Sequence, residues 1–310
     1  MLIPDHPALA DLSVLQLTDL PRYKTALAQT QRLSWHHYFV FLYFFGQRPD
    51  IRFLLEQDQG SLCVYRLRQN RSGQDLSLFM LPMPWKAQVL QRALARLWAF
   101  APDGKASVYR VDEADLAPFR GRADVRIVTC DAEYIYAPAQ YADLSGNRMR
   151  NLRRAVRAID AREDVRLVDY QPQTHEAACW QVYQRWAQHQ QSRYEAILHQ
   201  ALVRGCLSQY ELFGREDLLG QVAIVGDTVR AFGFAGAMHP GAGNQFLVYS
   251  DHTLPDLAKY MNYRLFLKFA HLPWVNSGNA GPTQGLALAK QALVPVALKP
   301  VYQLYFRPPR

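Results

Sequence analysis

The feature that most constrains the fold is a run of short apolar segments in the second half of the chain. Four such segments follow one another closely, and Gly226-Asp227 is a tight-turn signal between two of them. Closely spaced strand-like segments of this kind predict an antiparallel meander, because short turns join neighbouring strands. The predicted strands are residues 208–213, 219–225, 229–238 and 244–250.

Segments with other periodicities surround this meander and complete the second half of the chain. The predicted elements, in order, are a strand at 165–170, helices at about 174–191 and 195–206, the meander, a helix at 256–271, a strand at 273–276, a helix at 283–293 and a strand at 297–306. This order predicts an α+β fold in which helices cover a central mixed sheet.

The first half of the chain has a similar order of elements. A helix at 24–34, extended segments at 51–56, 61–67 and 75–81, a helix at 85–100 and strands at 106–111 and 125–130 are predicted. The order in both halves looks like the acyltransferase fold of the Gcn5-related N-acetyltransferases. We therefore predict two tandem acyltransferase-like domains with mixed sheets flanked by helices, at 1–135 and 136–310.

Composition limits the class of protein and of partner. The chain has 310 residues, 49% of them hydrophobic, and a formal net charge of +8, which indicates a globular protein with an affinity for a polyanion. The four cysteines are far apart, so a reducing compartment is expected. The most apolar stretch, 38–46, is too short to span a bilayer, and no secretory signal is seen, so we expect a cytoplasmic protein.

A basic helix is predicted at the join, over residues 146–160, with Ser145 as its N-cap. Leu152, Val156 and Ile159 fall on one apolar stripe of this helix. No acidic residue neutralises its arginines, and guanidinium groups bind phosphate oxygens through paired hydrogen bonds. The helix is therefore a candidate phosphate- or tRNA-binding surface, although a solvated face would look the same. The arginines are Arg148, Arg150, Arg153, Arg154 and Arg157.

A glycine-rich turn, residues 276–283, joins a predicted strand to a predicted helix. In the acyltransferase fold this junction lies beside the splayed centre of the sheet. Gly278 and Gly281 permit positive φ or close approach of a substrate, and Asn276 and Asn279 offer hydrogen bonds to a reacting group. Lys290 follows on the helix and could bind a phosphate or a carboxylate. A turn that only lets helix and strand pack remains the alternative.

The loop that binds acetyl-CoA in this fold is altered. That loop carries the pattern (Q/R)xxGx(G/A) after the fourth strand, whereas residues 250–263 of this chain read SDHTLPDLAKYMNY and contain no glycine. Without glycine, successive N–H groups do not easily form a cradle for a pyrophosphate. The sequence therefore argues against an ordinary CoA-dependent acetyltransferase.

Three stretches together, residues 133–156, 260–269 and 279–295, resemble the C-terminal domain of bacterial phosphatidylglycerol lysyltransferases and its stand-alone relatives. The resemblance implies a tandem acyltransferase fold and transfer of an aminoacyl group from aminoacyl-tRNA to a lipid head group, or to a small amine or hydroxyl group. Two departures put a lipid acceptor and a lysyl donor in doubt: the multi-helix membrane domain is absent, and no arginine follows Asp251 closely.

The resulting hypothesis is an aminoacyl-tRNA-dependent transferase that acts on a small soluble acceptor. Asn276 and Asn279 would stabilise the oxyanion, and Asp251 would bind the α-ammonium group or accept a proton. Tyr249, Tyr260 and Arg264 would line the cleft. No metal and no cofactor besides the co-substrate is expected. Two alternatives stay open: an acyltransferase that uses acyl-CoA or a carrier protein, and a non-catalytic RNA-binding module.

Overall fold

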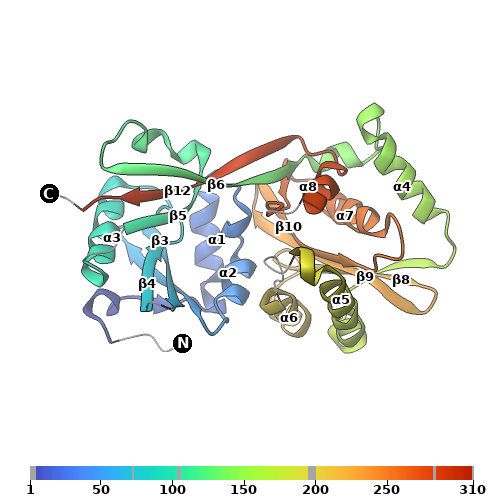
Figure 1. Ribbon diagram of the computed structural model, residues 1–310, viewed down its shortest axis with the longest axis horizontal. Coiled ribbons are helices and arrows are strands. Elements are labelled where there is room, and N and C mark those ends of the chain that lie inside the picture. Colours follow the sequence, from blue (N-terminus) through green and yellow to red (C-terminus); the bar gives the residue numbers. More distant parts are fainter. Residues whose placement is uncertain (1–4, 72, 103–105, 195–199, 282–283, 309–310) are drawn as a thin grey trace. The chain divides into compact units, whose positions relative to one another are not determined.

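The computed structural model describes residues 5–71, 73–102, 106–194, 200–281 and 284–308. The chain forms two compact units (Figure 1). Unit 1 contains Met1–Asp131 and Lys299–Arg310, and unit 2 contains Ala132–Leu298. The chain therefore passes from unit 1 to unit 2 within one strand and returns to unit 1 near its C-terminus.

Unit 1 is a mixed sheet with helices packed against it. The sheet order is β1-β2-β3-β4-β5-β12-β6, in which β4 and β5 are parallel and β5 and β12 antiparallel. The elements are β1 (Ser13–Val14), α1 (Leu20–Ala28), α2 (Phe39–Phe45), β2 (Ile51–Asp58), β3 (Ser61–Asn70), β4 (Gly73–Leu78), α3 (Ala87–Phe100), β5 (Ala106–Asp112), β6 (Val125–Tyr136) and β12 (Ala297–Phe306).

The core of unit 1 follows the pattern that its sequence predicts. Helix α3 buries a stripe that repeats every three or four residues, and this stripe packs on the apolar face of β3, β4 and β5. Burying each large aliphatic side chain contributes about 1.5–3 kcal/mol. The buried residues of the stripe are Val89, Leu90, Ala93, Leu94 and Leu97.

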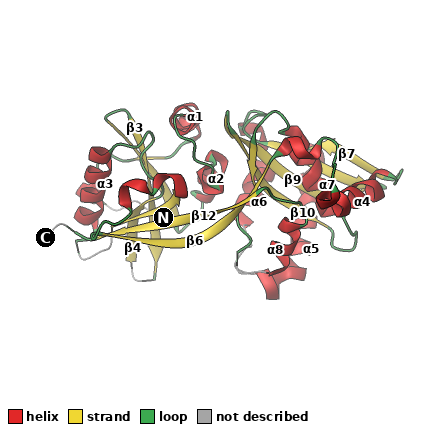
Figure 2. Cartoon of the chain, turned by 90° about the horizontal axis from the view of Figure 1, so that it is seen from above, coloured by secondary structure: helices red, strands yellow, loops and turns green. Residues whose placement is uncertain are grey.

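The last strand lies in a different unit from the one that the sequence suggests. The sequence analysis placed residues 297–306 in the second domain, but β12 pairs with β5, with Tyr302 opposite Val111 and Phe306 opposite Ala106. Strands β6 and β12 run side by side in both views (Figures 1 and 2). Pairing between segments so distant in sequence leaves no local signal, so element order alone could not place this strand.

Unit 2 has the layout expected from the meander. Its sheet order is β6-β11-β10-β9-β8-β7, with β10 and β11 parallel and the other described pairs antiparallel. The elements are α4 (Arg150–Asp160), β7 (Val165–Asp169), α5 (Pro172–Tyr194), α6 (Gln200–Ser208), β8 (Leu219–Val225), β9 (Thr228–His239), β10 (Ala242–Ser250), α7 (Leu257–Lys268), β11 (Trp274–Asn276) and α8 (Gln284–Gln291).

Helices cover both faces of the unit 2 sheet. Val248 of β10 packs toward Met261 of α7, whereas the neighbouring Tyr249 packs against Tyr183 of α5 at a ring-centroid distance of 5.1 Å. Successive residues of a strand point to opposite faces, so α7 and α5 lie on opposite sides of the sheet. Figure 1 shows the same arrangement, with α4 and α7 on one side and α5 and α6 on the other.

Strand β11 is short and pairs with β10 along its whole length, from Ala242 opposite Trp274 to Asn244 opposite Asn276. Just after this pairing, the register of β10 with β9 is irregular between Gln245 and Leu247. The glycine-rich turn follows β11 directly, as predicted.

Two predicted elements of the chain are wrong in detail. Residues 208–213 are not a strand: Tyr210–Leu212 form a 3-10 turn, because the Tyr210 ring packs edge-on against Tyr170 and its hydroxyl accepts a hydrogen bond from the Gly220 N–H. The helix predicted at 24–34 is α1, which begins earlier, with Pro21 in its first turn. Proline is favoured there because it has no N–H to donate and its φ is already helical.

Close packing across unit 2 makes Gly220 of β8 a sensitive position. A Cβ atom at this residue would lie 2.6 Å from Phe234 Cε1 and 2.7 Å from the Cβ of Tyr170, which is fixed to the backbone. Gly220→Ala is therefore expected to lower the free energy of unfolding by about 2–3 kcal/mol. Chemical denaturation measures this loss. Gly214→Ala is the control, because its Cβ would meet only Asp217 Oδ2 at 3.4 Å, and an equal loss there would contradict the packing argument.

Candidate active site in the second unit

The glycine-rich turn after β11 is held in one conformation by hydrogen bonds. Gly278 has φ +75° and Gly281 φ +54°, both in the left-handed region that favours glycine. The Gly278 carbonyl accepts from Tyr134 N (3.0 Å), and Ser277 N donates to the Tyr134 carbonyl (3.1 Å). The predicted positive φ values are confirmed, and β6 fixes the position of the turn.

Asn276 braces this turn with both ends of its side-chain amide. Its Nδ2 donates to Glu133 Oε2 at 2.7 Å, and its Oδ1 accepts from Gly278 N at 2.7 Å. Asn276 and Glu133 are each 1% exposed, so the bracket is inside the protein. These bonds occupy the Gly278 N–H and the Asn276 amide, which the sequence suggested as an oxyanion donor, and they give Asn276 a positioning role.

Asn279 lies at the same turn with a freer side chain. The residue is half-buried, and its side chain makes no hydrogen bond to any other residue in the described part of the chain. Its amide is thus a hydrogen-bond donor at the turn that follows β11. The catalytic role predicted for Asn279 stays a prediction, with a geometry that suits it.

Lys290 of α8 reaches back to the turn. Its ammonium nitrogen lies 3.0 Å from Ser277 Oγ and donates to the Ser277 carbonyl, and the Tyr134 ring centroid is 5.9 Å away. Burial lowers the pKa of Lys290 to about 7, a shift that the negative charge of Glu133 partly opposes. At neutral pH the amine is therefore close to half protonated and can accept or donate a proton.

The end of α8 and the residues after it are fixed by two tyrosines, one at the end of β6 and one in the segment that follows β6. The Tyr136 hydroxyl donates to the Lys290 carbonyl at 2.9 Å, and the Tyr141 hydroxyl donates to the Leu293 carbonyl at 2.5 Å. Both rings are buried, and burial raises the pKa of each hydroxyl, so both stay protonated donors. These bonds set the direction from which Lys290 approaches the turn.

Two of the predicted cleft residues make contacts that occupy them. Tyr249 is buried among the rings of Tyr183, Trp186 and Phe232. Asp251 forms an ion pair with Arg230 at 2.7 Å and accepts from the Thr253 N–H and hydroxyl. Desolvation would raise the Asp251 pKa, but these bonds outweigh it and hold that pKa at about 2. Asp251 is therefore a permanent carboxylate with its own partners.

Tyr260 and Arg264 of α7 form a chain of hydrogen bonds with α4. The Tyr260 hydroxyl donates to Asp160 Oδ1 at 2.8 Å and accepts from Arg264 Nη1 at 2.9 Å. This chain links the C-terminal end of α4 to α7. Tyr260 and Arg264, which were predicted to line the substrate cleft, thus lie at the packing contact of these helices.

The basic helix begins later than predicted and presents most of its arginines to solvent. Helix α4 starts at Arg150 after a 3-10 turn at Asn147–Met149, so Ser145 is not its N-cap, and the Ser145 N–H donates to Asp143 instead. The predicted apolar stripe is confirmed. Four arginines of this segment are exposed and form no ion pair with any described residue: Arg148, Arg150, Arg154 and Arg157.

Arg153 differs from these four because it holds the loop in front of the helix. Its guanidinium donates to the Leu144 and Gly146 carbonyls, where Leu144 has φ +52° and Gly146 φ +79°. Arg153→Gln is expected to lower the free energy of unfolding by about 1–2 kcal/mol. Arg154→Gln is the matched control with little expected change. Thermal or chemical denaturation compares them, and equal stabilities would show that Arg153 is only part of the solvated face.

Arg148 connects the basic segment to the end of the candidate site. Its Nη2 donates to the Pro295 carbonyl at 3.4 Å, and Gln140 Nε2 donates to the Val294 carbonyl at 3.1 Å. The arginine-bearing segment and the segment after α8 are therefore neighbours in unit 2. The predicted common cleft between the glycine-rich turn and the basic helix stays a prediction.

The loop before α7 is acidic at the position where the acyltransferase fold binds a pyrophosphate. Asp251 lies at the start of this loop, and Asp256, with φ +65°, is the N-cap residue of α7 and pairs with Lys259 at 2.5 Å. Carboxylates near a helix N-terminus compete with an incoming anion for its positive end. Both carboxylates already have cationic partners, Arg230 and Lys259, so the missing glycines remain the argument against a pyrophosphate at this loop.

The sequence analysis missed the residues that complete the site. Glu133, Tyr134 and Ser277 supply the buried carboxylate, the backbone pairing and the hydroxyl beside Lys290. A glutamate in the otherwise apolar end of β6 was a usable signal, since a buried acid needs a partner. In the described part of the chain, no three His, Cys, Asp or Glu side chains gather as a metal site.

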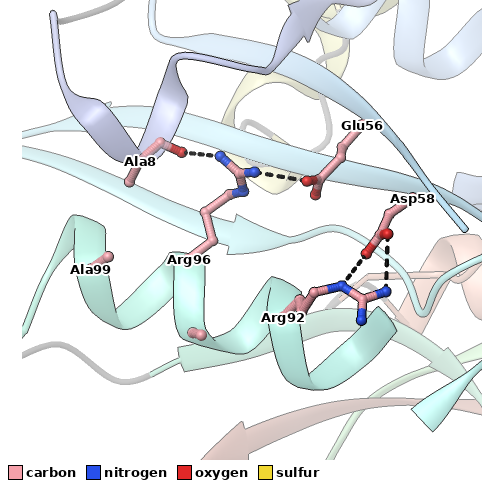
Figure 3. Close-up of a pocket in the computed structure, with 7 residues that line it drawn as sticks. Ala8, Glu56, Asp58, Arg92, Arg96 and Ala99 are labelled. Carbon is pink, nitrogen blue, oxygen red and sulfur yellow. Dashed lines mark hydrogen bonds and ion pairs between the residues drawn. The ribbon is translucent and has the colours of Figure 1, made fainter. Parts of the chain in front are cut away.

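Unit 1 has a charged pocket of about 410 Å³ between α3 and β2 (Figure 3). In it, Arg92 forms a two-pronged ion pair with Asp58, and Arg96 bridges Glu56 and the Ala8 carbonyl. Figure 3 shows each guanidinium directed at its carboxylate. The charges are already neutralised by each other, so the pocket offers less to a ligand than the site in unit 2.

Comparison with solved protein structures identifies the fold. A conserved protein of unknown function from Bacteroides thetaiotaomicron superposes with a TM-score of 0.82 at 17% identity, covering 96% of this chain and 99% of that one. L-PGS from Bacillus licheniformis gives a TM-score of 0.61 at 16% identity, covering 94% and 92%. A tandem GNAT protein from the clavulanic acid biosynthesis pathway gives 0.50 at 14%, covering 96% and 99%.

These likenesses establish a tandem acyltransferase fold of the Gcn5-related type. No curated protein matches the chain by sequence. In the described ranges, no helix combines the length and apolar character that a bilayer crossing requires. The family model described as "Phosphatidylglycerol lysyltransferase, C-terminal" matches residues 29–299, which is most of the chain. The chain therefore belongs to the phosphatidylglycerol lysyltransferase C-terminal domain family.

Proposed function

We propose that this chain transfers an aminoacyl group from aminoacyl-tRNA to a small amine or hydroxyl acceptor, at the turn between β11 and α8. The observation that carries the proposal is the group of exposed arginines without carboxylate partners, Arg148, Arg150, Arg154 and Arg157, in the same unit as Lys290. Clustered, unneutralised arginines bind the phosphates of a nucleic acid and release its counterions.

A CoA thioester is the competing donor, and the loop before α7 disfavours it. This loop contains no glycine and places Asp251 and Asp256 near the N-terminus of α7. A pyrophosphate would find no glycine-built cradle of free N–H groups there. A tRNA acceptor end has no pyrophosphate to seat at this position, so the same loop does not oppose it.

The chemistry needs a proton acceptor and a donor for the oxyanion. The acceptor nitrogen or oxygen attacks the ester carbonyl carbon, a new acyl bond forms, and the bond to the tRNA ribose oxygen breaks. The attacking group's proton passes to the neutral amine of Lys290 and then to the departing oxygen, while Asn279 donates to the oxyanion. Glu133 and Asn276 keep the turn in place during these steps.

The experiment is a transfer assay with a pool of charged tRNAs that carry labelled amino acids. If the proposal holds, one label leaves the tRNA and appears in a small-molecule product in the presence of a cell-extract acceptor pool. Parallel reactions with labelled acetyl-CoA test the competing donor. Binding of tRNA without loss of any label would instead support the RNA-binding module, and acetyl transfer alone would overturn the proposed donor.

Asn279→Ala is expected to slow this transfer by about tenfold, less than the loss of a fully buried oxyanion donor, because Asn279 is half-buried. The melting temperature should stay unchanged, since the side chain makes no hydrogen bond to the described residues. Steady-state rates and a thermal melt measure both effects. Unchanged turnover would remove Asn279 from the mechanism.

A further inference from the structure

Unit 1 contains a second and larger pocket, of about 750 Å³, on the face of α3 next to the charged one, and Ala95 lines both pockets. Its walls are α3, the turn at residues 122–124 and the end of β12. Pockets that hold small molecules have volumes of about 300–1,000 Å³ and mostly apolar linings. The apolar lining residues here are Leu94, Ala95, Trp98, Ala123, Phe306 and Pro308.

The walls of this pocket are held together in advance. The Arg307 N–H donates to the Asp124 carbonyl at 3.0 Å, which ties the end of β12 to the turn. Phe306 is buried and meets Phe119 edge-on at 5.9 Å. On α3, Leu94 and Trp98 are four residues apart and so share one face of the helix. The cavity therefore does not depend on a single mobile side chain.

Trp98 contributes its ring to the wall of this pocket. Its indole Nε1 is buried, so this atom does not open onto the cavity.

The charge at the rim of this pocket is positive. Arg122 is neutralised by a two-pronged pair with Asp124, at 3.0 and 2.6 Å. Arg307 is exposed and forms no ion pair with any residue in the described part of the chain. The rim therefore carries one uncompensated positive charge beside an apolar interior.

We propose that this pocket binds a small monocarboxylic acid with an apolar body, of the medium-chain fatty acid class. The apolar walls receive the hydrocarbon part, and Arg307 supplies the opposite charge. The charged pocket on the neighbouring face of α3 has no free positive charge of this kind, because its Arg92 and Arg96 already have carboxylate partners. The proposal is independent of the transfer reaction proposed for unit 2.

Isothermal titration of the full chain with decanoate tests the proposal, with decanol and acetate as comparison ligands. Decanoate should bind saturably at one site, and decanol and acetate each at least about tenfold more weakly. Arg307→Gln should weaken it and reduce its dependence on salt.

Ala123→Trp fills the pocket from the exposed turn and should abolish decanoate binding. Ala99→Trp is the matched control, because Ala99 is also exposed but lines only the charged pocket, and its binding should equal that of the wild type. Circular dichroism verifies that each variant is folded, and Gln91→Trp provides a second filling variant. Absence of saturable binding, retention of binding in both filled variants, or equal affinity for decanol would overturn the proposal.

Discussion

Replacing Lys290 with methionine is expected to lower the rate of acyl transfer by about 10²–10⁴-fold, the range that a positioned general base contributes. The amine lies 3.0 Å from Ser277 Oγ at the turn, and its pKa of about 7 leaves a large neutral fraction at physiological pH. Methionine has a similar length but cannot take up a proton. Single-turnover transfer from charged tRNA, at saturating acceptor, measures the loss.

The pH profile distinguishes a base from a fixed charge. If neutral Lys290 accepts the proton, the rate rises with pH through about 7 and then levels off. Lys290→Arg retains the positive charge but cannot lose it near neutral pH, so it should be as inactive as Lys290→Met. A rate that falls as pH rises through 7, or an active arginine variant, would instead assign Lys290 the role of a cation.

The same pKa shift predicts how stability depends on pH. The folded-state pKa of about 7 lies below the ordinary value of 10.5 for a free lysine, so between these values the unfolded chain binds more protons than the folded one. The free energy of unfolding of the wild type should therefore rise with pH in this window, relative to Lys290→Met. Parallel curves for the two proteins would show that the amine is not desolvated.

The double variant Arg150→Glu, Arg154→Glu is expected to weaken tRNA binding by about 100-fold at low salt, because each arginine removed from a phosphate contact costs about 1–1.5 kcal/mol. Both side chains are exposed and without ion pairs among the described residues, so the melting temperature should hardly change. The slope of log K against log salt should also become shallower by about two phosphate contacts. Filter binding over a salt series measures both quantities.

A control variant with the same change of net charge tests whether tRNA binds at α4 itself or is attracted by the overall charge of the protein. Arg162 and Arg215 are exposed arginines of unit 2 that already pair with Asp164 and Asp169. Arg162→Glu, Arg215→Glu should weaken tRNA binding far less than the α4 double variant. If both double variants weaken binding equally, the attraction comes from overall charge and α4 is not the tRNA surface.

The sequence predicted those parts of the fold that depend on local patterning. The stripe of α3 and the apolar face of α4 repeat with helical spacing, and the turn glycines Gly278 and Gly281 have the positive φ that their residue type permits. Element order was enough to identify the tandem acyltransferase fold. Errors arose where tertiary contacts outweigh local preference, as at Tyr210, whose ring and hydroxyl bind Tyr170 and Gly220.

Within the candidate site, the sequence located the turn but not the hydrogen bonds that hold it in place. It identified Asn276, Asn279 and Lys290 by their residue types near glycines. It could not show that the Asn276 amide forms hydrogen bonds to both Glu133 and Gly278, since Glu133 lies 143 positions earlier in the chain. It also could not separate Arg153, which holds a loop, from Arg154, which faces solvent.

By itself, then, the sequence determined the family, the order of elements and the residue types available for chemistry, because these follow from short-range spacing and composition. Only the tertiary structure decided which strand completes unit 1, which polar groups are already satisfied, and that the amine of Lys290 is drawn into a site where its charge is costly. Those outcomes depend on contacts between distant segments, and the desolvation and hydrogen bonding that such contacts bring are not encoded in any single stretch of residues.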